Sequence, residues 1–129
     1  MLSWELENRV STPERFGFMW ECPSYIELDA KGGAPAKWLS FSPQGLESGR
    51  WDRGNVYAAG YMPVTGDITA GKDAYDLGEF RLWDAGFDFY APQEFTAEDG
   101  RHILIGWMGM PDERPMATTP PWRAAGSTA

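Results

Sequence analysis

The chain has 129 residues, of which 43% are hydrophobic and 15% aromatic, and its formal net charge is −8. This length fits one domain of ordinary size, and the acidic charge repels phosphate backbones and anionic lipids, which argues against nucleic acid and membranes as partners. The single cysteine excludes an internal disulfide, and the lack of a signal-like or long apolar segment predicts a soluble, cytoplasmic protein.

The predicted elements are all β-strands, because no window of about a dozen residues carries a helical apolar stripe free of glycine or proline. The clearest turn is Glu98-Asp99-Gly100-Arg101, since Asp-Gly tolerates the positive φ angles of a tight hairpin. This pattern is typical of a sandwich, a barrel or propeller blades. The predicted strands, in chain order, cover residues 16–20, 25–28, 36–42, 55–61, 79–82, 87–95 and 102–108.

The strand pattern is lost after Met110, where proline, alanine and threonine dominate the sequence. We predict one folded unit over residues 1–115 and a disordered tail over residues 116–129.

A carboxylate interrupts an apolar stretch near the N-terminus. Residues 18–29 read FMWECPSYIELD, which places Glu21 and the only cysteine, Cys22, between Trp20 and Pro23. A carboxyl group in such surroundings could keep its proton near neutral pH and act as a general acid. The alternative is an exposed glutamate at a strand end, which the local sequence alone favours.

Other candidate site residues lie in the second half of the chain. Asp88 and Tyr90 are two positions apart and would share a face of a strand, although an aspartate that caps a turn is the simpler interpretation. Trp107 fits either a sugar-stacking platform or the core. The sequence contains no metal-ligand cluster, phosphate-binding loop or Ser-His-Asp arrangement, so we predict neither a metal nor a cofactor.

Four segments resemble, in order and spacing, glycoside hydrolase family 32, the family of invertase and sucrose-6-phosphate hydrolase. They are FGFMWECPSYIELD, WLSFSPQGL, NVYAAGYMPVTGD and LWDAGFDFYAPQEFTAEDGRHILIGWMG, and they cover about residues 16–110. The resemblance implies an all-β fold of about two four-stranded antiparallel blades from a five-bladed β-propeller. It also implies hydrolysis of β-fructofuranosides, such as sucrose or sucrose 6-phosphate, with retention of configuration.

The resemblance assigns roles to the matched residues. It implies that Glu21 is the acid/base, which protonates the leaving-group oxygen and later activates water, and that Cys22 lies beside it and influences its protonation. Asp88 and Tyr90 would lie near the fructosyl pocket, and Trp107 would line the pocket wall. Ser24 departs from the family, in which an aspartate commonly follows Glu-Cys-Pro, and this change puts a supporting contact in doubt.

Two aspartates of the family are missing from this sequence. The nucleophile belongs to an Asn-Asp-Pro segment and the transition-state-stabilising aspartate to an Arg-Asp-Pro segment, and neither string occurs here. A retaining enzyme without its nucleophile cannot form the covalent intermediate. We therefore predict an internal fragment that is inactive alone; the alternative is a non-catalytic carbohydrate-binding or interaction module derived from the same propeller.

Two further predictions concern the C-terminal tail and the association of the chain with itself. Shifting the frame by one base in a back-translation of MATTPPWRAAGST gives YGNHPTVARGWQH, which resembles the family's continuation and predicts a frame-shifted tail. Two isolated blades would expose apolar faces and strand edges, and we predict that the chain forms homo-oligomers through them.

Overall fold

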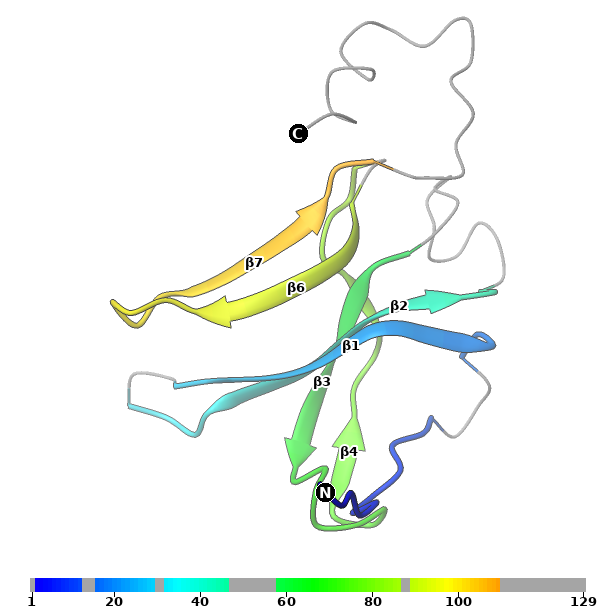
Figure 1. Cartoon of the computed structure of the whole chain (residues 1–129), viewed down its shortest axis with the longest axis vertical. Coiled ribbons are helices and arrows are strands. Elements are labelled where there is room, and N and C mark those ends of the chain that lie inside the picture. Colours follow the sequence, from blue (N-terminus) through cyan, green and yellow to red (C-terminus); the bar gives the residue numbers. More distant parts are fainter. Residues whose placement is uncertain (1, 13–15, 30–31, 47–57, 87–88, 110–129) are drawn as a thin grey trace, which may run out of the picture.

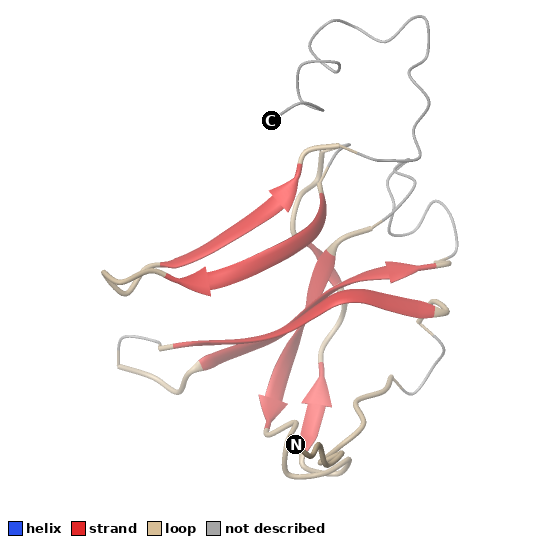
Figure 2. Cartoon of the chain, in the orientation of Figure 1, coloured by secondary structure: helices blue, strands red, loops and turns tan. Residues whose placement is uncertain are grey.

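The computed structural model describes residues 2–12, 16–29, 32–46, 58–86 and 89–109 (Figure 1). The predicted tail at residues 116–129 lies outside these ranges. Within them the chain consists of strands and loops without a helix (Figure 2). The strands are β1 (Met19–Leu28), β2 (Ala36–Gln44), β3 (Gly60–Gly66), β4 (Tyr75–Leu77), β5 (Arg81–Leu82), β6 (Tyr90–Thr96) and β7 (His102–Trp107).

The strands form two antiparallel sheets. The larger sheet has the order β1-β2-β3-β4, with β5 also paired to β3, and the smaller sheet is the β6-β7 hairpin. The hairpin lies beside the larger sheet, where β6 contacts both β1 and β2 (Figure 1). This is the arrangement of two successive propeller blades, so the predicted fold class is confirmed. The blades have five and two strands among the described residues, rather than four each.

One continuous strand, β1, replaces the two predicted strands at residues 16–20 and 25–28. Pairing with β2 passes from Glu21 opposite Ser42 to Ser24 opposite Ser40, so β1 carries one extra residue at this point. Such a β-bulge absorbs the extra residue without ending the ladder. Our prediction of a break was wrong because proline at a bulge needs no hydrogen-bond partner for its nitrogen.

The third strand also differs from the prediction. Residues 55–57 of the predicted strand lie outside the described residues, and β3 runs on to Gly66, past Pro63. The Pro63 carbonyl oxygen still accepts a 2.8 Å hydrogen bond from the Gly78 nitrogen. A proline can therefore occupy this strand, and the partner strand β4, with three residues, is too short for sequence periodicity to predict.

The predicted hairpin between β6 and β7 is confirmed. The Gly100 nitrogen donates to the Ala97 carbonyl oxygen at 2.9 Å, and the Ala97 nitrogen donates to the Arg101 carbonyl oxygen at 2.8 Å. Gly100 has a φ of 83°, a conformation that residues with a side chain rarely adopt.

The hydrophobic core lies on one face of the larger sheet. Alternation along β2 directs Leu39 and Phe41 into this core, and the Trp20 ring stacks on Phe41 with ring centroids 4.2 Å apart. The N-terminal segment packs against this core through Val10, and its Asn8 side chain donates a 2.6 Å hydrogen bond to the Ile68 carbonyl oxygen. The buried core residues are Leu39, Phe41, Ala58, Met62, Val64 and Phe80.

The opposite face of β2 is polar and points toward the hairpin. Ser40 and Ser42 are buried there, and the Trp83 indole nitrogen donates to the Ser40 hydroxyl at 2.9 Å. After Trp38, which is on the face toward the second blade, the sequence LSFSPQ thus alternates apolar side chains toward the core with polar ones toward the second blade. This polar layer positions the site described below.

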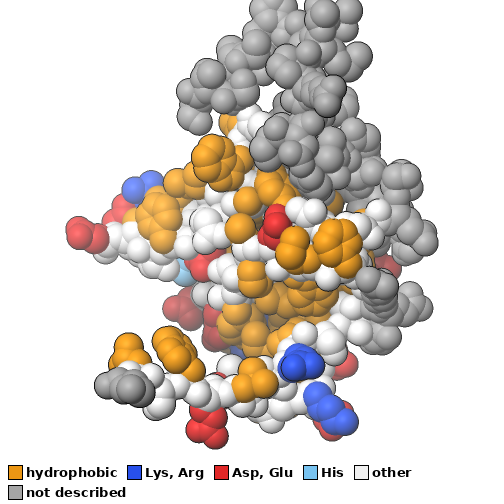
Figure 3. Space-filling model, turned by 45° about the vertical axis from the view of Figure 1, so that its right-hand side comes forward, with side chains coloured by type: hydrophobic (Ala, Val, Ile, Leu, Met, Phe, Trp, Pro, Cys, Tyr) orange, Lys and Arg blue, Asp and Glu red, His pale blue; other side chains and the backbone are white. Residues whose placement is uncertain are grey.

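Hydrophobic side chains are exposed at several places on the surface (Figure 3). On the hairpin, Gln93 is opposite Ile105 and Phe95 is opposite Ile103, and alternation along β7 places Trp107 on the side of Ile105. We call the exposed apolar residues of this set, Phe95, Ile105 and Trp107, the outer face. Phe95, Ile105 and Trp107 are 48%, 60% and 69% exposed. No helix within the described residues is long and apolar enough to span a membrane.

Candidate functional site

Three side chains from three strands meet where the two sheets come together. Glu21 extends from β1, Gln44 from the end of β2 and Tyr90 from the start of β6. The Gln44 side-chain nitrogen lies 3.0 Å from Glu21 Oε2 and 2.9 Å from the Tyr90 hydroxyl oxygen. The Tyr90 hydroxyl in turn donates to the same Glu21 oxygen. We call these three residues the carboxylate cluster.

Two matching β-bulges hold this cluster. After Glu21, Cys22 has a φ of 48° and precedes Pro23; after Tyr90, Ala91 has a φ of 45° and precedes a proline. Each strand carries one extra residue at this point relative to its partner. Residues other than glycine rarely have positive φ, and such conformations concentrate at functional sites. The same backbone feature therefore follows each residue of the Glu21–Tyr90 contact.

The surroundings keep Tyr90 protonated. Burial raises the pKa of the Tyr90 hydroxyl well above its ordinary value, and its hydrogen bond to Glu21 raises that pKa further. The phenol remains neutral at physiological pH and donates to the carboxyl group. The Gln44 side chain is an amide without a proton that titrates in this range, so both partners of the Glu21 oxygen are permanent donors.

Ser24 makes the second polar link between the sheets. The bulge places Ser24 on the same face as Glu21, and its hydroxyl donates to Glu94 Oε1 on β6 at 3.0 Å. An aspartate here would set a second carboxylate against Glu94 and would repel it. The serine that departs from the family pattern therefore fits its neighbour in this chain.

A buried hydroxyl lies next to the cluster. Ser42 is opposite Glu21 on β2 and is fully buried, and its Oγ has no hydrogen-bond partner among the residues that the structure describes. A buried hydroxyl without a partner is unfavourable by about 1–3 kcal/mol.

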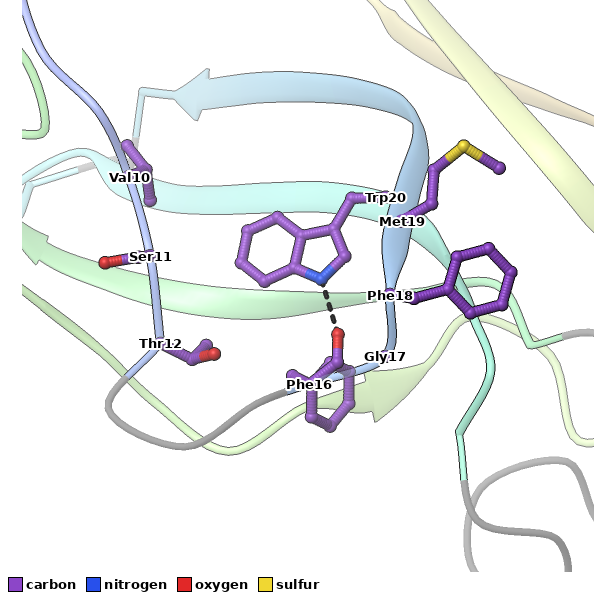
Figure 4. Close-up of a pocket in the computed structure, with 8 residues that line it drawn as sticks. All are labelled: Val10, Ser11, Thr12, Phe16, Gly17, Phe18, Met19 and Trp20. Carbon is purple, nitrogen blue, oxygen red and sulfur yellow. Dashed lines mark hydrogen bonds between the residues drawn. The ribbon is translucent and has the colours of Figure 1, made fainter.

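Trp20, the neighbour of Glu21 in sequence, faces the other way. It lines an open cavity of about 340 Å³ together with Val10, Ser11, Thr12 and residues 16–19, and its indole nitrogen donates to the Phe16 carbonyl oxygen at 2.7 Å (Figure 4). Glu21 is absent from the residues that line this cavity. Gln44 and Tyr90, rather than Trp20, therefore contact the carboxylate.

The structure brings together some of the predicted site residues. Glu21 is half-buried inside a strand, so it is not an exposed strand-end glutamate, and Tyr90 contacts it directly. Cys22 follows Glu21 and is exposed. Trp107 lies opposite Tyr90 in the hairpin and is exposed, and Asp88 lies outside the described residues.

Gln44 is the site residue that the sequence analysis missed. The signal was present in WLSFSPQ, where every second residue after Trp38 is polar although the strand is otherwise buried. Buried polar groups usually have hydrogen-bond partners, and two of these three side chains, Ser40 and Gln44, have them here. Over the described ranges, no group of three His, Cys, Asp or Glu side chains could hold a metal ion.

Comparisons with known proteins find a matching family model and similar proteins. Residues 1–129 match the model of the glycosyl hydrolases family 32 N-terminal domain. The sucrose-6-phosphate hydrolase of Staphylococcus xylosus is 41% identical over 113 residues, which cover 87% of this chain and 22% of that protein. The chain thus spans about a fifth of the length of this curated relative.

Solved structures show the same similarity. The sucrose-6-phosphate hydrolase from Lactobacillus gasseri superposes with a TM-score of 0.63 at 29% identity, over 81% of this chain and 21% of that one. A mutant of a Bombyx mori β-fructofuranosidase, solved in complex with sucrose, gives a TM-score of 0.58 at 32% identity, over 87% of this chain and 21% of that one.

Proposed function

Because this chain belongs to glycoside hydrolase family 32, we propose that it supplies the proton-transferring side of a site that hydrolyses sucrose or sucrose 6-phosphate. The observation that carries the proposal is the carboxylate cluster, in which a half-buried glutamate contacts two fixed donors. Glycoside hydrolysis by this class of enzyme needs one carboxylic acid to protonate the leaving oxygen. Glu21 is the carboxyl group that we assign to this step.

The reaction uses Glu21 twice. As an acid, it gives its proton to the glycosidic oxygen while the bond from that oxygen to the fructosyl carbon breaks. As a base, it takes a proton from the water that then attacks the fructosyl group. We propose that Cys22, Asp88 and Tyr90 lie around the fructosyl group and that Trp107 forms part of the pocket wall.

We propose that the 129 residues do not complete the reaction by themselves. The sequence lacks both Asn-Asp-Pro and Arg-Asp-Pro, the segments that carry the other two carboxylates in the resemblance. An acid/base without a nucleophile cannot form a covalent glycosyl-enzyme intermediate. Incubation of the chain with sucrose and sucrose 6-phosphate should release no fructose, and release that disappears in Glu21→Gln would overturn this part of the proposal.

A chimera tests the function directly. The matching segment of the Staphylococcus xylosus sucrose-6-phosphate hydrolase is replaced by the segment of this chain that aligns with it, and turnover of sucrose 6-phosphate is measured. Glu21→Gln should lower kcat/KM by about 10²–10⁴-fold, the usual contribution of general acid–base catalysis. The control Glu94→Gln changes a carboxylate in the same blade interface and should cost far less. An active chimera that Glu21→Gln leaves intact would refute the assignment.

A further inference from the structure

Both donors in the carboxylate cluster converge on one oxygen of the Glu21 carboxyl group. The Gln44 nitrogen and the Tyr90 hydroxyl each donate to Oε2, and the Gln44 nitrogen also donates to the Tyr90 oxygen. The three groups form a closed triangle of hydrogen bonds. Among the described residues, Oε1 of Glu21 has no hydrogen-bond partner.

Resting on the function proposed above, we propose that Gln44 is a positioning residue that fixes Oε2 of Glu21, so that proton transfer takes place at Oε1. Two donors at Oε2 exclude a proton from that oxygen, because a third hydrogen would face the hydrogens of both neighbours. The acidic proton of the neutral carboxyl group therefore resides on Oε1. It leaves Oε1 for the glycosidic oxygen, and a proton from water returns to Oε1 in the second half of the reaction.

The same triangle serves both protonation states of Glu21. In the neutral acid Oε2 is a carbonyl oxygen, and in the anion it is a carboxylate oxygen, and in both forms it accepts hydrogen bonds. Neither donor has to reorient while the proton moves. A site that needs no reorganisation at the moment of reaction is the arrangement that electrostatic catalysis favours.

Backbone contacts hold Gln44 in place. The Phe18 nitrogen donates to the Gln44 carbonyl oxygen at 2.8 Å, and Gly17 approaches the same oxygen so closely that a Cβ at Gly17 would overlap it. The residue before Gln44, Pro43, is fully buried. The backbone of the positioning residue is thus fixed before its side chain reaches Glu21.

Side-chain amide exchange in the full chain tests the proposal without any turnover. The sequence contains two glutamines, so exposed Gln93 is an internal reference, and the Gln44 signal is identified by its loss in Gln44→Met. In a ¹⁵N-labelled chain, both Gln44 amide protons should exchange with deuterium more slowly than those of Gln93. Gln44 protons that exchange as fast as those of Gln93 would overturn the proposal.

Two substitutions at Glu21 decide whether one oxygen accepts both donors. Glu21→Gln keeps a single acceptor oxygen, so the slow exchange of both Gln44 protons should persist. Glu21→Leu removes that acceptor, so the Gln44 proton bound to it should exchange faster while the proton bound to the Tyr90 oxygen stays slow. If the two donors used different oxygens of Glu21, one Gln44 proton would exchange faster in Glu21→Gln, as it does in Glu21→Leu. That result would overturn the proposal.

A milder variant guards against loss of the fold. Tyr90→Phe removes one hydroxyl, so one Gln44 proton should exchange faster while the other stays slow. Unchanged exchange of both protons would contradict the triangle. The Trp20 indole proton, which donates to the Phe16 carbonyl oxygen, reports the folded state in every variant. Since no fructoside is present, failure here is distinct from failure of the proposed hydrolysis.

Discussion

At the scale of single residues, hydrogen bonds from Gln44 and Tyr90 set the environment of the Glu21 carboxyl group. This group receives donors from two other strands, whereas the aromatic neighbour in the same strand faces the core. Burial and the bond to Glu21 raise the pKa of Tyr90, so the phenol stays neutral at physiological pH and donates to Glu21. The consequences can be measured residue by residue.

The raised pKa of Tyr90 predicts a pH dependence of stability. In the unfolded chain the phenol has a pKa of about 10, below its value in the folded chain, so the contribution of neutral Tyr90 is fully present below about pH 10. It is lost as the pH rises toward the folded value. Urea unfolding between about pH 8 and 11 should show a steeper loss of stability in the unaltered chain than in Tyr90→Phe. Equal slopes would contradict the environment assigned to Tyr90.

The two buried serines of β2 should respond differently to removal of their hydroxyls. Ser40→Ala leaves the Trp83 indole without its acceptor and should cost about 1–2 kcal/mol of unfolding free energy. Ser42→Ala removes a hydroxyl without a partner among the described residues and should be neutral or stabilising. Denaturant unfolding of both variants checks this, and equal losses would argue against the difference between the two sites.

At the scale of elements, the matched bulges in β1 and β6 orient the Glu21 and Tyr90 side chains toward each other. Each bulge needs a residue with positive φ ahead of a proline, and neither Cys22 nor Ala91 is the glycine that such a position usually carries. The strands accept this unfavourable conformation at the point where the two blades exchange hydrogen bonds. The positive φ angles of these two residues therefore coincide with the contact between the blades rather than with a turn of the sheet.

Substitution of Ala91 tests the second bulge. Ala91→Val places a β-branched side chain at a φ of 45° and should cost about 1–2 kcal/mol of unfolding free energy. Ala91→Gly suits the same conformation and should be tolerated within about 0.5 kcal/mol. Thermal unfolding distinguishes the two. A valine variant as stable as the glycine variant would show that the bulge is not required in this form.

The β2 strand and the β6-β7 hairpin could be predicted from the sequence, although β2 contains Pro43 and β6 contains Pro92, whereas the full extents of β1 and β3 could not. β2 and the β6-β7 hairpin follow from polar alternation and an Asp-Gly turn. β1 and β3 contain prolines, which usually end strands, but a bulge and an accepting carbonyl preserve the pairing here. The Glu21–Tyr90 contact joins residues 69 positions apart, so only the resemblance to a family could have suggested it.

At the scale of the whole molecule, the outer face of the hairpin is the clearest surface for association. It carries Phe95, Ile105 and Trp107, all substantially exposed, next to a strand edge. Apolar faces of this kind usually contact another protein surface. We propose that copies of the chain associate through it.

A double substitution checks this association. Ile105→Ser with Trp107→Ser should lower the fraction of dimers and larger species in sedimentation velocity experiments. The control Leu2→Ser with Leu6→Ser removes two exposed apolar side chains from the N-terminal segment, which lies away from the hairpin (Figure 1), and should leave the distribution unchanged. A monomeric unaltered chain at high concentration, or equal effects of the two variants, would contradict the proposal.

The acid role of Glu21 can be tested most directly by the dependence of the rate on the leaving group. In the chimera, hydrolysis of sucrose needs a proton on the departing oxygen, whereas an aryl β-fructofuranoside with an acidic phenol leaves without one. Glu21→Gln should therefore reduce the cleavage step for sucrose by about 10²–10⁴-fold and leave that step for the aryl fructoside nearly unchanged. Equal losses on both substrates would mean that Glu21 is not the proton donor.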